Sequence, residues 1–469
     1  MEARLKKNLS YQTTYQLLTV ATPLIVTPYV SRTLGSANIG IYSYTNSIAY
    51  YFVMFALLGV ANYGSRKIAS VSSSIEKRSR VFSEIYGSQF IMGLLMTLIY
   101  TVYLLFFCDY ENKISTIQIL YVLTGVFDIS WLFFGIEDVK PVVIKNTIIK
   151  LVSLFGIFIL VKKPEDLWIY TLLLAGGQLG GCISMWLSLK NKVNVVMPSF
   201  SGIRHHIIPN ITLFIPVISI SVYKTMDKIM IGALSTDSQV GFYTNAESLI
   251  NAPMGFVTAV GTVMLPRITA MLANNEIEKS ILYFRKSLSV TMGFICAAAF
   301  GIIAVAPVFV PIYYGSGFEE CIFLLEGQAI ILIFIAWANI VRTQYLLPHK
   351  KDQQYIVSII MGAIVNVIFN AILIPKFQAR GALIATIFAE GIVCVIQSHE
   401  ASRHIQMRKC LRDNFPFLLM GMIMLVAVRF SMNKFGYSVS GLIIEIAIGV
   451  IVYIPMLLLY YYTYLKKHI

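Results

Sequence analysis

Three charged residues lie together inside a long apolar stretch of this chain. Lys224, Asp227 and Lys228 are spaced at i, i+3 and i+4, which places them on one face of a helix. Their single net positive charge suits an anionic ligand better than a proton relay. A charge at the centre of a membrane helix costs about 2.5–3.5 kcal/mol, so the cluster indicates a function. The alternative is a self-neutralising group that extends towards the membrane surface.

Other cations lie within or beside apolar stretches. Lys150 is close to the middle of its stretch, so we expect it to face a wet cavity, whereas Lys145 is near enough to the inner end to reach the surface. Arg32 and Arg342 lie near the ends of their stretches, where anchoring at the interface explains them equally well. The candidate ligands for an anionic group are therefore Arg32, Lys150, Lys224, Lys228 and Arg342.

Two arginines occupy matching positions in an internal repeat. Gly40-Ile-Tyr and Gly241-Phe-Tyr each precede an apolar stretch, and Arg66 and Arg267 follow these stretches at the same offset. An even number of spans separates the copies, so the halves share one orientation and are related by an axis along the membrane normal. Arg66 and Arg267 are candidates for an inner gate or for contacts with lipid phosphates, and topogenic signals explain them equally well.

Polar residues form a stripe on the first apolar stretch. Gln12, Tyr15 and Gln16 lie three or four residues apart along it, and their amides and hydroxyls would suit sugar recognition. Hydrogen bonding between helices is the alternative. The best candidates for coupling to H⁺ or Na⁺ are Asp227 and Glu390, although Glu390 would equally pair with a cation on a neighbouring helix. Asn366 and Asn370 favour helix contacts over ligand binding.

Several kinds of chemistry have no support in the sequence. No nucleophile is paired with a base, no phosphate-binding loop is present, and the six cysteines show no metal-binding spacing. We therefore expect no enzymatic activity, no metal site and no cofactor. We interpret the glycine-rich run at 176–181 as close helix packing, and His205-His206 as part of a charged inner loop. The excess of Lys and Arg lies mainly in short loops, so we expect no nucleic-acid partner.

The composition identifies the elements that carry these residues. Of 469 residues, 57% are hydrophobic and 13% are charged, against about a quarter charged in a soluble chain. The apolar residues recur in blocks of roughly 20, the length of a membrane-spanning helix. The sequence therefore predicts an all-α integral membrane protein with about 14 spans. These are 9–30, 40–61, 83–107, 115–135, 141–161, 166–189, 208–233, 246–266, 287–313, 321–346, 354–374, 379–398, 414–431 and 440–464.

The loop charges and the repeat predict how the spans are organised. With the N-terminus inside, the inner segments hold 24 Lys and Arg and the outer loops hold 7. This bias predicts that both termini are cytoplasmic. The repeat predicts an N-terminal lobe of six spans at 1–206, a C-terminal lobe of six spans at 207–400 and an extra helix pair at 401–469.

The chain resembles the Wzx-type polysaccharide-repeat flippases of the multidrug/oligosaccharidyl-lipid/polysaccharide exporter superfamily. The resemblance covers nearly the whole chain in order. It rests on the stretches PLIVTPYVSRTLGSANIG at 23–40, DKIMIGALSTDSQVGFY at 227–243, MLPR at 264–267, YG at 314–315 with GF at 317–318, and NVIFNAILIPKFQARGALIATIFAE at 366–390. Among the five candidate ligands for an anionic group, only Arg32 and Lys228 lie within these stretches.

The resemblance implies two pseudo-symmetric six-helix lobes around a central cavity, as in multidrug exporters, plus two C-terminal helices. It implies a flippase that moves an oligosaccharide repeat on undecaprenyl pyrophosphate from the inner to the outer leaflet of the bacterial cytoplasmic membrane by alternating access. Its products would be capsule, O-antigen, teichoic acid or another surface polysaccharide. Membrane lipids and polysaccharide polymerase or assembly proteins would be its partners.

Three other functions stay open at this stage. A lipid II flippase fits the span count equally well, and only the motifs disfavour it. A multidrug exporter of the same superfamily usually has 12 spans and an acidic cavity. The net positive charge inside the spans of this chain argues against that function. A membrane glycosyltransferase or polymerase would need a catalytic carboxylate near a large outer loop, and the chain has no large outer loop.

Overall fold

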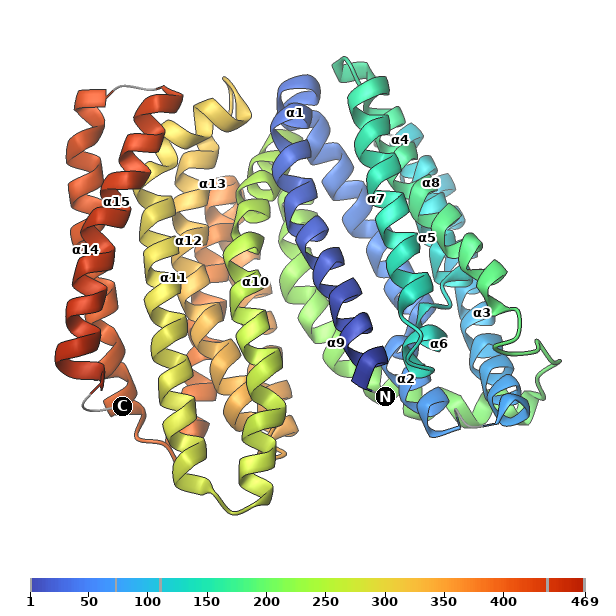
Figure 1. Ribbon diagram of the computed structural model, residues 1–469. Helices are drawn as coiled ribbons and strands as arrows, with labels where there is room; N and C mark the ends of the chain where they lie inside the picture. The colour runs from blue at the N-terminus through green and yellow to red at the C-terminus, as the bar shows by residue number, and fades with distance from the viewer. Residues whose placement is uncertain (1, 72–73, 109–111, 436–437, 467–469) are drawn as a thin grey trace. The chain divides into compact units, whose positions relative to one another are not determined.

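The computed structural model describes residues 2–71, 74–108, 112–435 and 438–466 (Figure 1). Within these ranges the side chains at 2–21, 112, 215–216, 223–224 and 433–435 lie outside the described part. The described chain is built from helices, and it divides into two compact units, residues 1–232 and 233–469. The predicted lobe boundaries at 206/207 and 400/401 stay predictions.

The described residues of unit 1 form nine α-helices. Those long enough to cross a membrane are joined by short connections, and α4, α5 and α6 together cover the predicted span 115–135. The helices are α1 (Glu2–Leu57), α2 (Val60–Ser70), α3 (Ile75–Phe106), α4 (Asn112–Ile117), α5 (Ile119–Phe127), α6 (Ser130–Gly135), α7 (Lys140–Leu160), α8 (Leu167–Trp186) and α9 (Phe200–Leu234).

Two helical regions of unit 1 are broken at identifiable residues. Helix α1 is interrupted at Gly35, whose φ of 77° and ψ of 169° lie in a region that only glycine adopts readily. The path from α5 to α6 is interrupted at Asp128, whose Oδ1 accepts a 2.9 Å bond from the backbone N–H of Ser130. This bond satisfies an N–H at the start of α6, where no helical partner exists.

Unit 2 contains six longer α-helices. They are α10 (Asp237–Ala273), α11 (Ile277–Tyr314), α12 (Glu320–Val341), α13 (Asp352–Ala401), α14 (Met407–Phe435) and α15 (Val439–Tyr460). A turn of π-helix, Arg342–Leu346, extends α12, and a second one, Tyr461–Leu465, extends α15. Helix α13 is broken at Gln378, where φ is 54°. The largest core cluster of this unit lies among α11, α12, α14 and α15.

The helix bounds agree with the predicted membrane architecture. Eleven segments of the described residues are long and apolar enough to span a membrane. Two of them, Thr22–Ser70 and Asp352–Ala401, contain the breaks at Gly35 and Gln378, and each covers two predicted spans. Helix α9 covers the predicted span 208–233. The all-α membrane fold is thereby confirmed, and the total of 14 spans stays a prediction.

The internal repeat is visible in where the helices begin and end. The break at Gly35 corresponds, at an offset of 201 residues, to Thr236 in the connection between α9 and α10. Helix α3 begins at Ile75 and α11 begins at Ile277, within one residue of the same offset. Helix boundaries of the two halves therefore correspond at these two places.

Candidate functional site

The predicted cation cluster lies on α9, which packs against the second half of α1 within unit 1. A Cβ on Gly232 would come within 2.2 Å of the Tyr44 ring, and the Tyr51 hydroxyl donates a 3.2 Å bond to the Ser221 carbonyl. Asp227 is buried with 2% of its surface exposed, and Lys228 is half-buried. The side chain of Lys224 lies outside the described residues. Asp227 is therefore buried inside unit 1, and the role of Lys228 in binding a head group stays a prediction.

The other candidates on the first spans have different surroundings. Arg32 is exposed one turn before the break at Gly35, and Lys150 is half-buried on α7. The side chains of Gln12, Tyr15 and Gln16 lie outside the described residues, so the predicted sugar-facing stripe stays a prediction.

The expectation that Lys145 reaches the membrane surface is wrong. Its side chain is 7% exposed, and its Nζ donates a 3.2 Å bond to Ser130 Oγ and lies 4.0 Å from Asp128 Oδ1. Ser130 Oγ in turn donates to Asp128 Oδ1 at 2.5 Å. The break between α5 and α6 brings this carboxylate opposite α7. The sequence indicates this contact only by an acid and a lysine inside adjacent predicted spans. The break at Asp128 was not predicted.

The interpretation of His205-His206 as part of a charged inner loop is wrong, because both residues lie in α9. His205 is exposed, whereas His206 is 2% exposed. Its Nδ1 shares a 2.6 Å hydrogen bond with the Tyr63 hydroxyl, and its Nε2 lies 3.2 Å from Glu84 Oε2. Burial lowers the pKa of His206, although the contact with Glu84 opposes this shift. His206 therefore links α2, α3 and the start of α9 in its neutral form.

The two arginines of the repeat are held differently. Arg267 is exposed on α10, donates a 2.7 Å bond to the Tyr283 hydroxyl and lies over the Tyr283 ring at 4.2 Å. Arg66 is exposed on α2. The residue that matches Tyr283 at the offset of 201 is Phe82, which has no hydroxyl and is buried against Trp131. The proposed gate or lipid-phosphate contact stays a prediction for both arginines.

Arg342 is half-buried at the start of a π-helical turn in unit 2. Its guanidinium donates a 3.1 Å bond to the Tyr355 hydroxyl, and its Nε is buried without a hydrogen-bond partner among the described residues. A cation in this setting has hydrogen-bonding capacity left for an anion.

Glu390 lies beside a buried polar network on α13. Glu390 is 3% exposed, and Asn366 and Asn370 are fully buried. Asn370 Nδ2 donates to Asn366 Oδ1 at 3.1 Å, and Asn366 Nδ2 donates to Thr386 Oγ1 at 3.2 Å. The two asparagines therefore join the halves of α13, as predicted, while the ion-coupling role of Glu390 stays untested.

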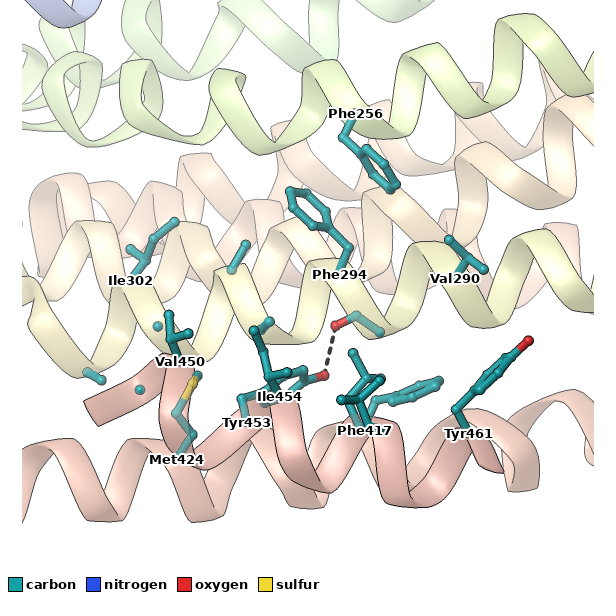
Figure 2. Close-up of a pocket in the computed structure, with 18 of the residues that line it drawn as sticks. Phe256, Val290, Phe294, Ile302, Phe417, Met424, Val450, Tyr453, Ile454 and Tyr461 are labelled. Atoms are coloured by element: carbon teal, nitrogen blue, oxygen red, sulfur yellow. Dashed lines mark hydrogen bonds between the residues drawn. The ribbon is translucent and has the colours of Figure 1, made fainter. Parts of the chain in front are cut away.

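Unit 2 contains an apolar groove lined by described residues. It has a volume of about 970 Å³ and runs between α11, α14 and α15 (Figure 2). Small residues of α11, namely Gly293, Ala297, Ala298, Gly301 and Ala304, give it depth. Its walls carry aromatic and aliphatic side chains, including Phe256, Phe294, Ile302, Phe417, Val450 and Ile454 (Figure 2).

The two ends of the groove differ in charge. Lys286 and Lys466 are exposed at one end. Near the other end Glu445 is fully buried, and neither carboxylate oxygen has a hydrogen-bond partner among the described residues. Arg429, on α14, pairs with Glu326 and donates a 2.6 Å bond to the Ile303 carbonyl. The sequence places Glu326, Glu445 and Arg429 within predicted spans. Their arrangement could not be predicted, because it depends on the packing of α14 and α15 against α11 and α12.

The described residues have the architecture of a multi-pass membrane protein. A solved structure described as a lipid II flippase, MurJ, in an inward closed conformation is similar with a TM-score of 0.79 and 16% identity, covering 96% of this chain and 99% of that one. An inward-facing multidrug resistance transporter of the MATE family, in the same superfamily, has a TM-score of 0.63 and 14% identity over 88% and 95% of the chains. The two similarities show the exporter-superfamily fold.

The sequence comparisons identify the family within this class. The model of the family described as polysaccharide biosynthesis protein matches residues 5–272, more than half of the chain. A relative in Escherichia coli strain K12, named "Putative O-antigen transporter", is 25% identical over 397 residues, which cover 83% of this chain and 94% of that protein. A glycan biosynthesis flippase, Agl15, of Haloferax volcanii is 25% identical over 333 residues, 67% of this chain and 66% of that one. The chain belongs to the polysaccharide biosynthesis protein family.

Proposed function

We propose that this protein is a flippase that moves a lipid-linked oligosaccharide from the inner to the outer leaflet by alternating access. Its substrate would be an oligosaccharide repeat on a prenyl pyrophosphate, used to build a cell-surface polysaccharide. The family match and the names of the relatives support this substrate class. The role is non-catalytic, because the lipid carries the sugars across intact.

The apolar groove of unit 2 carries the proposal most directly. Lys286 and Ala304 lie 18 positions apart on α11, so the groove extends about 27 Å at 1.5 Å per residue. This is close to the thickness of the hydrocarbon core. A prenyl chain in the groove would bury its methylenes against Phe294, Ile302 and Val450, each methylene contributing about 0.8 kcal/mol. A groove of this shape and polarity fits a long hydrocarbon chain better than a compact drug.

Cations of each unit are candidate ligands for the head group. Lys286 and Lys466 lie at one end of the groove, and Lys228 and Arg342 are half-buried in units 1 and 2. A phosphate that leaves water needs charge-assisted hydrogen bonds to offset its dehydration. Arg32, Lys150, Lys224, Lys228 and Arg342 are therefore our proposed ligands for the pyrophosphate and for anionic sugars.

The orientation and location are part of the proposal. We place the protein in the bacterial cytoplasmic membrane with both termini in the cytoplasm, because the predicted inner segments are rich in Lys and Arg. Polysaccharide polymerase and assembly proteins would be its partners in the outer leaflet steps. Coupling to H⁺ or Na⁺ through Asp227 or Glu390 is a further element of the proposed cycle.

The deciding experiment measures the lipid-linked oligosaccharide in each leaflet after the protein is depleted from its host. We expect the intermediate to accumulate facing the cytoplasm and the wild-type gene to relieve the accumulation. Lys228→Gln should relieve it poorly, whereas Lys190→Gln, which removes an exposed charge from unit 1, should relieve it fully. Accumulation of the peptidoglycan precursor would favour a lipid II flippase. Drug sensitivity without any accumulated lipid would favour a multidrug exporter.

A further inference from the structure

Glu445 is a buried acidic residue that has no role in the transport cycle proposed above. It lies on the face of α15 that packs against α14, together with Gly441 one turn before it and Gly449 one turn after it. The glycines leave space around the carboxyl group, and Met424 and Val428 of α14 form the apolar surface beside Gly449. The carboxyl group is thus enclosed by hydrocarbon.

The surroundings of Glu445 offer no hydrogen bond in the described part of the chain. Its exposed fraction is 0%, and both carboxylate oxygens lack a partner. The nearest cation is Arg429 on α14, which is already bound to Glu326 of α12 and to the Ile303 carbonyl of α11. The Tyr453 hydroxyl, two turns away on α15, donates to the Gly293 carbonyl at 2.8 Å.

The remaining charges of the groove are too far away to neutralise a carboxylate. Lys466 follows Glu445 by 21 residues on the same helical path, which is about 31 Å. Lys286 lies at the same end of the groove as Lys466. An ionised carboxylate without hydrogen bonds inside a protein is strongly unfavourable, so the group takes up a proton instead. With Glu445 neutral, Arg429 and Glu326 balance each other.

We propose that Glu445 is a proton-binding site of the apolar groove, protonated when the groove is closed around hydrocarbon and ionised when water enters. On ionisation the carboxylic acid transfers its proton to water, and the carboxylate then competes with Glu326 for Arg429. A net negative charge in the groove destabilises its closed form and weakens the binding of a prenyl chain there. Proton release therefore accompanies release of the hydrocarbon chain. The link to chain release rests on the proposed flippase function, whereas the protonation of Glu445 does not.

Infrared spectroscopy of the full chain in lipid nanodiscs measures the protonation directly. Protonated carboxylic acids absorb separately from carboxylates, so the wild-type spectrum at neutral pH should contain a band that disappears in Glu445→Gln. Glu326→Gln is the matched control, because Glu326 is ion-paired, and this variant should keep the band. Loss of the same band in Glu326→Gln, or an unchanged spectrum in Glu445→Gln, would overturn the proposal.

Thermal unfolding of the same two variants gives an independent readout. Glutamine resembles a neutral acid, so Glu445→Gln should unfold at nearly the wild-type temperature. Glu326→Gln leaves Arg429 without its carboxylate and should unfold at a lower temperature. If both variants lose stability equally, Glu445 is an ionised partner of Arg429 and holds no proton.

Transport by the reconstituted protein separates this proposal from the flippase assignment. Wild-type transport of a prenyl-pyrophosphate oligosaccharide should change with an imposed pH gradient, whereas Glu445→Gln should transport at a rate that the gradient does not change. A wild-type protein without transport would contradict the proposed function and leave the infrared result standing. A variant that responds to the gradient like the wild type would contradict the link between Glu445 and chain release.

Discussion

At the residue scale the structure places charges inside spans in two kinds of environment. The Lys145–Ser130–Asp128 group and the Arg429–Glu326 pair neutralise themselves within one unit. Lys228 and Arg342 are half-buried and remain our candidates for binding an anion. A sequence shows that a charge lies inside a span, but its partner depends on which helix faces it. Asp128 illustrates this, because it reaches Lys145 only where the helix is broken.

Removing only the acid of a buried ion pair should lower the free energy of unfolding more than removing both partners. We expect Asp128→Asn to lower the free energy of unfolding by about 3 kcal/mol, because it leaves Lys145 charged at 7% exposure. The double variant Asp128→Asn, Lys145→Met should recover most of this loss. Reversible unfolding in detergent, followed as a double-mutant cycle, measures the coupling. If the effects of Asp128→Asn and of Lys145→Met alone simply add up in the double variant, the two groups do not interact.

The burial of His206 predicts a dependence of stability on pH. Its pKa is lowered in the folded protein, so the unfolded chain binds the proton more readily than the folded one. Unit 1 should therefore lose stability as the pH falls below about 6.5, the ordinary value for histidine. Melting temperatures between pH 8 and pH 5.5 measure this effect. His206→Gln should reduce the slope and His205→Gln, which changes an exposed neighbour, should not; the reverse order would exclude His206 as the cause.

At the element scale the glycines of α8 show which members of a glycine-rich run make a close contact with a neighbouring helix. Gly180 and Gly181 are neighbours in the run at 176–181, which we interpreted as close helix packing. A Cβ on Gly181 would come within 2.0 Å of Ile149 on α7, whereas a Cβ on Gly180 would meet nothing within 4 Å. The sequence therefore predicted the type of contact correctly, and the rotation of α8 against α7 decided which glycine makes it.

This difference gives a matched pair of substitutions. Gly181→Ala should destabilise the protein by about 1–3 kcal/mol, because Ile149 and the backbone must shift. Gly180→Ala should be neutral or stabilise it by up to about 1 kcal/mol, because alanine favours a helix. Thermal unfolding of both variants measures the contrast. Equal effects would mean that α8 faces α7 through another side.

The helix breaks mark the limit of what the sequence could predict. Hydrophobic blocks and loop charges were sufficient to predict the all-α membrane fold and most spans, because lipid imposes a helix on any chain that crosses it. They could not show that α1 runs through the first two predicted spans of the chain with a break at Gly35. They also could not show that α13 is broken at Gln378, where φ is 54°. Such positions follow from local backbone conformations that hydropathy does not encode.

At the scale of the whole molecule the groove offers a direct test of where the hydrocarbon chain binds. Gly301→Leu would project into the groove, where a Cβ meets only Met424 at 3.9 Å. Loss of about two buried methylenes of the chain would reduce transport about tenfold. Gly391→Leu, at a helical glycine of α13 with nothing within 4 Å, is the control. Flipping assays in proteoliposomes should separate them, and equal activities would place the hydrocarbon chain elsewhere.

The pair Arg267 and Tyr283 makes the two halves unequal at corresponding positions. In unit 2 a tyrosine holds the arginine through its ring and hydroxyl, whereas the matching aromatic residue in unit 1, Phe82, is turned into the core. The duplicated halves therefore differ in how firmly they restrain the same charge. A duplication starts from two equal copies, so a difference of one hydroxyl group is the kind of change by which one copy acquires a role that the other does not share.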